Sequence, residues 1–219
     1  MGQRIARWRG FGALASLIIV LVWAGGCHRQ RGLRHLPQAV RIAVLDFDVP
    51  EIFNTSKEIR GWWFGAHDIY RNPYAGEAFA DVLARRLRQF AFVDVYLRKD
   101  LKVYMAMQKN RVMRAYPQLS EKGIEELLEQ IEPWEWGKDL GVDKVITGKL
   151  LVGRTVHNRT IHWWYSTVEA QIQLIDAESG SIDWERAVHC TKQFASQQRT
   201  QERLADRVVR QLKKRHLLE

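Results

Sequence analysis

The residue types that could carry chemistry are few in this chain of 219 residues, and they form no recognisable catalytic set. His157, His162, His189 and Cys190 fall on neighbouring predicted strands, and imidazole and thiolate are ligands that zinc prefers. Their spacing matches no zinc motif, and the sequence contains no motif of the GxSxG, HExxH or phosphate-binding glycine-loop kind. We therefore expect no metal site, no cofactor and no enzyme activity.

Asp46 and Asp48 lie at the end of a predicted strand, where a pair of carboxylates can act as general acid and base. The interpretation that we favour is structural, with these carboxylates capping a turn or pairing with arginine side chains. Cys190 lies in an apolar stretch and is expected to be a small buried side chain.

The chemistry that the sequence does predict is a lipid modification at Cys27. Three arginines among the first nine residues precede an apolar run of about 14 residues, typical of a signal peptide and too short to span a bilayer comfortably. The run ends in Ala24-Gly25-Gly26-Cys27, which resembles a bacterial lipobox, although leucine is more usual than alanine at its first position. The resemblance implies cleavage before Cys27, a diacylglycerol on its sulfur and an acyl chain on its amino group, and such multiple acylation anchors a protein stably.

This interpretation divides the chain into a lipoprotein signal peptide (residues 1–26), a lipid-anchored tether (residues 27–38) and one domain (residues 39–219). His28 follows the cysteine, where an aspartate would favour retention at the inner membrane. We therefore expect the periplasmic side of the outer membrane. The alternatives are a signal peptide with an incidental cysteine and an uncleaved N-terminal anchor.

The basic residues indicate possible partners. The formal net charge of +9 falls to +6 when the signal peptide, with three arginines and no acidic residue, is removed. The remaining positive charge concentrates in residues 28–35 and 203–215. Such a surface suits anionic lipid, peptidoglycan or an acidic polysaccharide, and the plainer alternative is a solvated basic face. Export from the cytoplasm argues against nucleic acid as a partner.

The hydrophobic pattern predicts an α+β domain with helices packed against a mostly antiparallel sheet. Residues 51–74 show neither the hydrophobic period of a helix nor that of a strand and are predicted to form a loop. The predicted strands are residues 41–47, 92–96, 144–156, 166–176 and 181–192. The predicted helices are residues 75–90, residues 101–114 with Asp100 as N-cap, a helix capped by Ser120, residues 134–140 ended by Gly141, and a C-terminal helix on which Leu204, Val208 and Leu212 share a face.

The strand at residues 166–176 has the clearest alternation. Apolar side chains at the even positions from Val168 to Leu174 alternate with Glu169, Gln171 and Gln173, which predicts one buried and one polar sheet face. Residues 177–180 then predict a hairpin turn, for which Gly180 supplies the flexible position.

Three segments together resemble the CsgG family of outer-membrane lipoproteins. They are the strand Ile42–Phe47 with the helix around Ala80–Leu83, the segment LGVDKVITGKL from Leu140, and the segment VEAQIQLIDAESGSI from Val168. The namesake of the family is the curli secretion channel, and relatives include the PelC exopolysaccharide-export lipoprotein and LpoB-type activators of peptidoglycan synthases. The resemblance implies the family's periplasmic α+β domain over residues 41–215.

One departure from the family affects the expected function. Channel-forming members carry long insertions that become membrane-spanning hairpins, each needing two strands of about 9–11 residues. Here the connection between two predicted strands is only residues 154–165, and the chain turns polar and helical soon after Cys190. We therefore expect a CsgG-like periplasmic domain without membrane-spanning hairpins.

Two aromatic segments are candidate interaction sites. The resemblance places Trp62, Trp63, Tyr70, Asn72 and Tyr74 in a segment that lines the central opening of a ring in the curli channel, and the alternative is a loop that covers its own core. The second segment is a hairpin tip with Trp163, Trp164 and Tyr165, which could contact lipid headgroups, a neighbouring subunit or its own core.

The sequence therefore predicts a periplasmic lipoprotein of the outer membrane, forming a ring or scaffold in a protein or polysaccharide export apparatus as a homo-oligomer. The alternative is a monomeric lipoprotein that regulates a cell-envelope partner such as a peptidoglycan synthase. A tether of about a dozen residues reaches at most roughly 40 Å, which argues against the alternative.

Overall fold

The structure is a computed structural model that describes residues 39–54, 57–61 and 65–218, with the backbone alone described at residues 54, 57–61 and 65–67. These residues belong to one compact unit, residues 37–219. The predicted signal peptide, the tether with Cys27, and the aromatic residues Trp62 and Trp63 lie outside the described residues. Within the part that is described, every helix is too short or too polar to cross a membrane.

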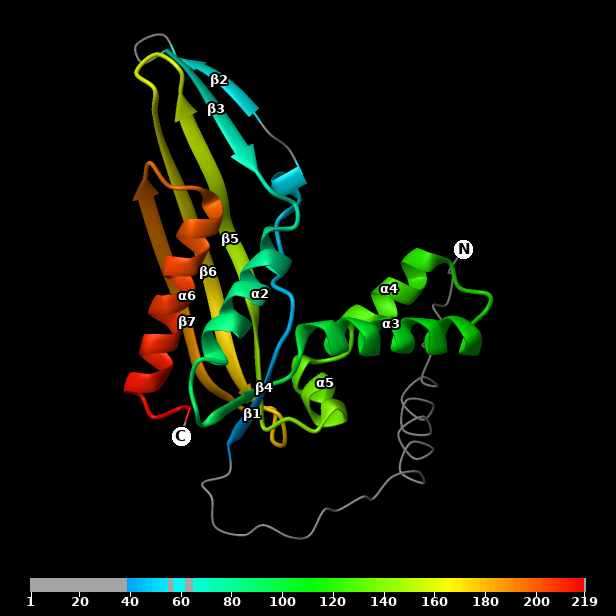
Figure 1. The fold of residues 1–219 in the computed structure, drawn as a ribbon. Coiled ribbons are helices and arrows are strands. Elements are labelled where there is room, and N and C mark those ends of the chain that lie inside the picture. Colours follow the sequence, from blue (N-terminus) through cyan, green and yellow to red (C-terminus); the bar gives the residue numbers. More distant parts are fainter. Residues whose placement is uncertain (1–38, 55–56, 62–64, 219) are drawn as a thin grey trace, which may run out of the picture. The chain divides into compact units, whose positions relative to one another are not determined.

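The sheet is organised around one long strand, β5 (Lys144–Asn158). Along one edge, β5 pairs over its whole length with β6 (Trp163–Asp176), which pairs with β7 (Ile182–Gln193), all antiparallel. The other edge of β5 is divided: β1 (Val40–Val44) pairs with its beginning in parallel, and β3 (Gly65–Arg71) pairs with its end antiparallel. Outside these lie β4 (Val93–Val95) beside β1 and β2 (Lys57–Gly61) beside β3 (Figure 1).

Two helices, α2 (Ala75–Leu87) and α6 (Gln197–Lys214), cover one face of the sheet. Their apolar stripes and the inward side chains of β1, β5 and β6 form the larger core cluster, in which Phe79, Leu83 and Leu204 are fully buried. The predicted alternation of β6 is confirmed, because Val168 and Ile172 are fully buried on this face.

The described helices cover the other face at one end only. There α5 (Pro133–Leu140) and the beginning of α3 (Arg98–Ala115) enclose a second cluster that includes Ala43, Leu101, Trp136 and Val145. The later part of α3 packs against α4 (Glu121–Glu129). Farther along the sheet this face carries the predicted polar residues of β6. The predicted α+β class with a mostly antiparallel sheet is thus confirmed.

Several local predictions are confirmed by the backbone. The Ser120 hydroxyl accepts a hydrogen bond from the Gly123 amide at 3.2 Å and caps α4. Gly141 ends α5 with φ of 65°, and Gly180 occupies the β6–β7 turn with φ of 71°, both in the left-handed region that suits glycine. Cys190 is 3% exposed, as expected.

The predicted loop over residues 51–74 is wrong. It contains a 3-10 helix (Glu51–Asn54), then β2 and β3. Strand β3 is stabilised by pairing with the far half of β5, where Ile69 lies opposite Val156 and both are 7% exposed. Because the partner strand is almost 90 residues away in the sequence, the local pattern did not reveal the strand.

The predicted N-cap at Asp100 is also wrong. Helix α3 begins at Arg98 after Leu97, and Asp100 lies in its first turn, where a carboxylate favours the positive end of the helix dipole. The earlier start allows Arg98, which is 7% exposed, to donate to the Val44 carbonyl at 2.8 Å and to pair with Asp46 and Asp81. The interpretation of Asp46 as the ion-pair partner of an arginine is therefore confirmed.

Candidate functional site

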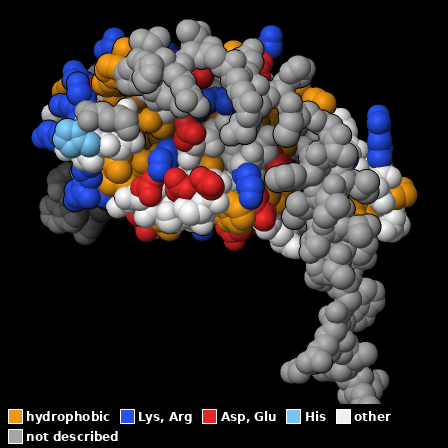
Figure 2. Space-filling view, turned by 90° about the horizontal axis from the view of Figure 1, so that it is seen from below, with side chains coloured by type: hydrophobic (Ala, Val, Ile, Leu, Met, Phe, Trp, Pro, Cys, Tyr) orange, Lys and Arg blue, Asp and Glu red, His pale blue; other side chains and the backbone are white. Residues whose placement is uncertain are grey.

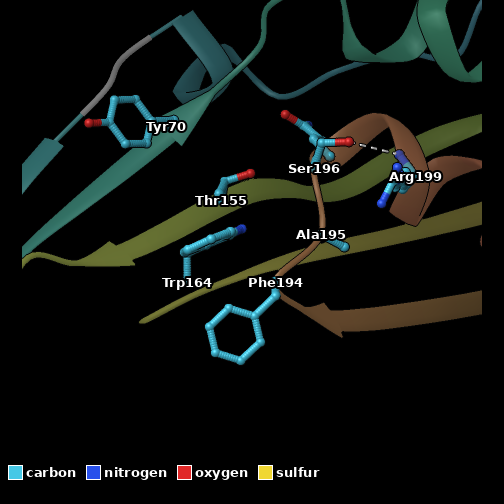
Figure 3. Close-up of a pocket in the computed structure, with 8 residues that line it drawn as sticks. Tyr70, Thr155, Trp164, Phe194, Ala195, Ser196 and Arg199 are labelled. Carbon is cyan, nitrogen blue, oxygen red and sulfur yellow. Dashed lines mark hydrogen bonds between the residues drawn. The ribbon is translucent and has the colours of Figure 1, made fainter. Parts of the chain in front are cut away.

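An open groove of about 600 Å³ lies at the end of the sheet where the β5–β6 hairpin turns. Tyr70 from β3, Thr155 from β5 and Trp164 from β6 form one side of it (Figure 3). The connection from β7 into α6 forms the other side, with Phe194 and Arg199 among its lining residues. The groove therefore brings together three segments far apart in the sequence.

The groove exposes large aromatic side chains. Tyr70 is 50% exposed, Trp164 37% and Phe194 56%, although apolar rings of this size are usually covered. The ring centroids of Trp164 and Phe194 lie 5.1 Å apart in an edge-to-face arrangement. Exposed aromatic side chains of this kind are enriched at protein–protein interfaces.

The backbone of Phe194 is in the left-handed region, with φ of 51°, where a non-glycine residue costs about 1 kcal/mol. Its amide donates to the Trp164 carbonyl at 2.9 Å, which extends the β6–β7 ladder by one residue. The next residue, Ala195, is buried, so the chain turns at Phe194 and leaves the ring outside. The conformation thus presents an aromatic ring in the groove.

Most polar groups of the groove already have structural partners. The Thr155 and Ser166 hydroxyls hydrogen-bond each other at 2.8 Å, and Ser166 donates to the Ala195 carbonyl at 2.7 Å. Ser196 accepts from the Arg199 amide at 3.3 Å and caps α6. Within the described residues, Gln197 Nε2 is buried without a hydrogen-bond partner. Among the described residues that line the groove, no nucleophile is hydrogen-bonded to a base.

A bidentate ion pair fixes β3 next to the hairpin tip. Arg159 donates through Nε and Nη2 to the two oxygens of Asp68 at 2.6 and 2.8 Å, and the Tyr70 hydroxyl donates to the same carboxylate at 3.3 Å. The hydrogen bonds from Arg159 hold the pKa of Asp68 below its usual value. Asp68 is only 6% exposed, and its ion pair with Arg159 fixes the carboxylate in place. The hydrogen bond from Tyr70 to this carboxylate therefore positions Tyr70 at the groove.

The structure separates the residues that the sequence grouped together. Tyr70 and Trp164, predicted in different segments, both line the groove. Trp163 and Tyr165 point to the opposite sheet face, where their ring centroids lie 4.9 Å apart. Tyr74 is 72% exposed, in a turn where its amide donates to the Asn72 side chain at 2.9 Å. Whether the aromatic segment lines an opening stays a prediction.

The sequence analysis did not identify Phe194, Gln197 and Arg199. A signal was present, because Phe194 stands between a strand and Ser196, a typical helix N-cap. The four histidine and cysteine positions singled out earlier do not converge: the described residues contain no group of three or more potential metal ligands. His189 instead hydrogen-bonds to the Thr191 hydroxyl at 3.1 Å.

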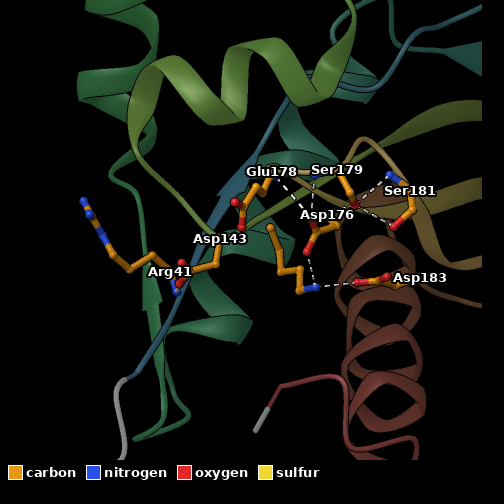
Figure 4. Close-up of polar contacts among 8 residues, drawn as sticks. Arg41, Asp143, Asp176, Glu178, Ser179, Ser181 and Asp183 are labelled. Carbon is orange, nitrogen blue, oxygen red and sulfur yellow. Dashed lines mark hydrogen bonds and ion pairs between the residues drawn. The ribbon is translucent and has the colours of Figure 1, made fainter.

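The opposite end of the sheet carries a polar cluster of a different kind (Figure 4). The Asp176 carboxylate accepts from the Ser179 amide and hydroxyl, both at 2.8 Å, and from Lys144 Nζ at 2.8 Å. Lys144 also donates to Asp183 at 2.6 Å. The hydrogen bond from Lys144, followed by those from Ser179, holds the pKa of Asp176 well below its usual value. This cluster closes the β6–β7 turn.

The comparisons with known proteins concern the fold. No protein-family model and no curated protein sequence matches the chain. The chain is similar to a variant PelC dodecamer structure from Paraburkholderia phytofirmans, with 15% identity over 83% of this chain and 94% of that chain and a TM-score of 0.45. It is also similar to lipoprotein GNA1162 from Neisseria meningitidis, with 15% identity, 80% and 99% coverage and a TM-score of 0.45. The chain is also similar to the LpoB C-terminal domain from Salmonella enterica, with 13% identity over 81% of this chain and 95% of that chain and a TM-score of 0.37. At these identities and TM-scores the similarities concern the fold alone.

Proposed function

We propose that this chain is a non-enzymatic lipoprotein of the cell envelope, anchored through Cys27, that assembles with copies of itself as a ring or scaffold of an export apparatus. The observation that carries the proposal is the aromatic groove. Tyr70, Trp164 and Phe194 remain exposed around one groove at one end of a well-packed domain, and aromatic side chains are enriched at protein–protein interfaces.

The sheet edge next to the groove supports self-association. Within the described residues, β7 pairs with β6 only, so the outer backbone groups of a 12-residue strand are free of strand partners. The strand ends at Gln193, directly before Phe194, so the open edge leads into the groove. A contact between copies that used the free edge of β7 and the groove would cover the edge and the aromatic side chains together. In a closed ring of such contacts, no copy would keep an uncovered edge or groove.

The first experiment is the native mass of the acylated mature protein, extracted in detergent, together with negative-stain images. We expect a discrete assembly of several copies. Phe194→Ala should reduce it to smaller species, because the ring at the centre of the groove is removed. Phe92→Ala is the matched control, since Phe92 is similarly exposed, at 54%, but lies in the α2–β4 connection outside the groove.

A monodisperse monomer of the acylated protein without substitutions would contradict the proposal. If Phe194→Ala and Phe92→Ala reduced assembly equally, the groove would not be the assembly site. Loss of any exposed aromatic side chain would then be enough to weaken assembly. Mass photometry at nanomolar concentration would separate weak from obligate assembly.

A docking regulator is the second candidate function, favoured by helix α3. Val103 is 53% exposed, Met107 61% and Met113 44%, so this helix presents apolar side chains that the described part of the chain leaves uncovered. Methionine-rich helix surfaces suit binding to a partner protein. Under this function the native mass is that of a monomer, and Met107→Ser, not Phe194→Ala, disrupts the interaction with the partner.

A further inference from the structure

The exposed side of α6 carries a row of cations. Arg199, Arg203, Arg207, Arg210 and Lys214 follow one another at spacings of three or four residues and are all exposed. Residues three and four apart lie on the same side of a helix, so these five form one ridge, with a cation about every turn. The opposite side of α6 is buried against the core, as shown by Leu204, Val208 and Leu212 among others.

The ridge keeps its positive charge within the described structure. Its cations form no ion pair with a described carboxylate: Arg207 donates to the His189 carbonyl at 2.6 Å, and Arg210 donates to the Asp206 carbonyl at 3.0 Å. The Asp206 carboxylate pairs with Arg86 of α2 at 3.0 Å. The positive potential on this side is therefore available to an external anionic surface.

Positive and negative side chains are separated at the end of the domain where α6 finishes. Viewed from below, blue Lys and Arg side chains gather at the left, where α6 ends in Figure 1, and red Asp and Glu side chains gather nearer the middle (Figure 2). The acidic residues of this end include Asp176 and Asp183, both already bound to Lys144. An anionic plane would therefore attract the α6 side.

The chain enters the domain beside the last turn of α6. The Val40 amide at the start of β1 donates to the Phe92 carbonyl at 2.9 Å. Two residues before Phe92, the Phe90 ring lies 5.7 Å from Lys213 Nζ. The same short α2–β4 connection thus contacts both the start of β1 and the end of α6. Any anchor on the preceding residues pulls this region towards the membrane.

The length of the preceding segment limits the orientation. The twelve residues 27–38, however arranged, span at most about 40 Å. Strand β5, with 15 residues, is about 50 Å long and leads from the region of β1 to the aromatic hairpin tip. A domain standing on its aromatic tip would place β1 about 50 Å from the headgroups, beyond that reach. A domain lying on α6 keeps β1 well within it.

We propose that the α6 ridge is a peripheral membrane-binding surface for anionic phospholipid headgroups, holding the anchored domain on its α6 side. The orientation, though not the headgroup binding, rests on the lipid anchor of the proposed function. In this orientation the groove lies at the end of the domain where α6 begins, and Arg199 belongs to both the groove and the ridge.

The test uses the mature chain without Cys27, residues 28–219, which has no acyl chains and keeps all the described residues of the two core clusters. Binding is measured to vesicles of phosphatidylcholine alone and to vesicles with about one-third phosphatidylglycerol. We expect binding at least 100-fold tighter to the anionic vesicles and a steep loss as salt is added. Replacement of Arg203, Arg210 and Lys214, which do not line the groove, by glutamine should weaken binding about 100-fold, roughly fivefold for each cation.

The matched control replaces three exposed cations of α3 by glutamine: Lys99, Arg111 and Arg114. Its change in net charge is identical, so equal loss of binding in the two triple variants would overturn the proposal in favour of unspecific attraction. Equal binding of the unmodified chain to both kinds of vesicle would overturn it too. So would binding to soluble polygalacturonate without binding to anionic vesicles, which would make the ridge a site for acidic polysaccharide. Circular dichroism confirms that each variant is folded.

A second measurement tests the orientation in the acylated full mature protein. In anionic vesicles, amine labelling of Lys213 and Lys214 should fall several-fold relative to neutral vesicles, whereas labelling of Lys122 on α4 should not change. Unchanged labelling of all three lysines would contradict the orientation. Assembly is measured separately by native mass, so failure of lipid binding and failure of ring formation are distinguishable.

Discussion

The two ends of the sheet differ in how completely the chain satisfies its own side chains. At the β6–β7 turn, the Asp176 carboxylate accepts hydrogen bonds from Lys144, from Ser179 and from the Glu178 amide at 3.1 Å. At the β5–β6 end, Trp164 and Phe194 stay exposed around a groove. The side chains at the β6–β7 turn are bound to one another, whereas the aromatic side chains at the β5–β6 end stay exposed to solvent.

This difference separates stability from interaction. A turn with a fully engaged carboxylate stabilises the hairpin that it closes, and its substitution should lower the free energy of unfolding. An exposed aromatic pair and a left-handed Phe194 add little to folding, so substitution there should alter assembly instead. Each of the following predictions tests whether the two ends divide in this way.

The largest effect on stability is expected for Asp176→Ala. The change removes the acceptor of the turn and leaves Lys144, which is partly buried, with Asp183 as its carboxylate partner. The free energy of unfolding should fall by about 2 kcal/mol in urea titrations. Glu178→Ala, in the same turn but exposed, is the control and should change it by less than about 0.5 kcal/mol. Equal effects would contradict a stabilising role for this carboxylate.

The stability should also depend on pH through Asp176. Its pKa in the folded chain lies below the usual value of 3.8, because Lys144 and Ser179 hydrogen-bond to the ionised carboxylate. The contribution is therefore fully present above pH 3.8 and is lost as the pH falls towards the folded pKa. Urea midpoints between neutral and acidic pH should fall more steeply for the unmodified protein than for Asp176→Asn. Parallel curves would show that other carboxylates dominate the acid response.

Gly180→Ala should lower the free energy of unfolding by about 1–2 kcal/mol. Gly180 has φ of 71°, and an added Cβ would lie 3.2 Å from the Trp134 indole. Thermal unfolding monitored by circular dichroism measures the loss. An unchanged midpoint would mean that the turn relaxes to accept a side chain.

Phe194→Gly should change the free energy of unfolding least, by less than about 0.5 kcal/mol, although it removes a large side chain. Glycine relieves the left-handed strain, and the greater freedom of the unfolded chain offsets that gain. The same variant should lose the native assembly. A stability loss above about 2 kcal/mol would instead place Phe194 among the residues that hold the fold together, and the comparison of the two ends would fail.

Much of the fold could be predicted from local sequence because each signal has a short-range physical cause. The alternation of Val168 to Leu174 reflects the two-residue period of a strand, and the spacing of Leu204, Val208 and Leu212 reflects the helical period. Ser120 and Gly141 mark helix ends because they act on backbone groups within four residues. The same reasoning placed the β6–β7 turn at Gly180.

The candidate site could be predicted only in part. Tyr70 and Trp164 were recognised as unusual aromatic residues, but their meeting depends on the pairing of β3 with β5 and of β5 with β6. Phe194 was missed because the junction between a strand and the Ser196 N-cap indicates a turn but does not show that Ala195 would be buried and the ring exposed. Exposure of a side chain is a property of the packed domain.

The sequence by itself determined which segments are apolar on one side, where most helices and turns end, and that Cys27 stands in a lipobox-like context. Only the tertiary structure decided that β2 and β3 are strands, that Arg98 pairs with Asp46, and that the exposed cations of α6 form a ridge beside the start of β1. The physical reason is the range of the interactions. Periodicity and capping act over a few residues, whereas strand pairing, buried ion pairs and surface charge depend on residues that only the folded chain brings together.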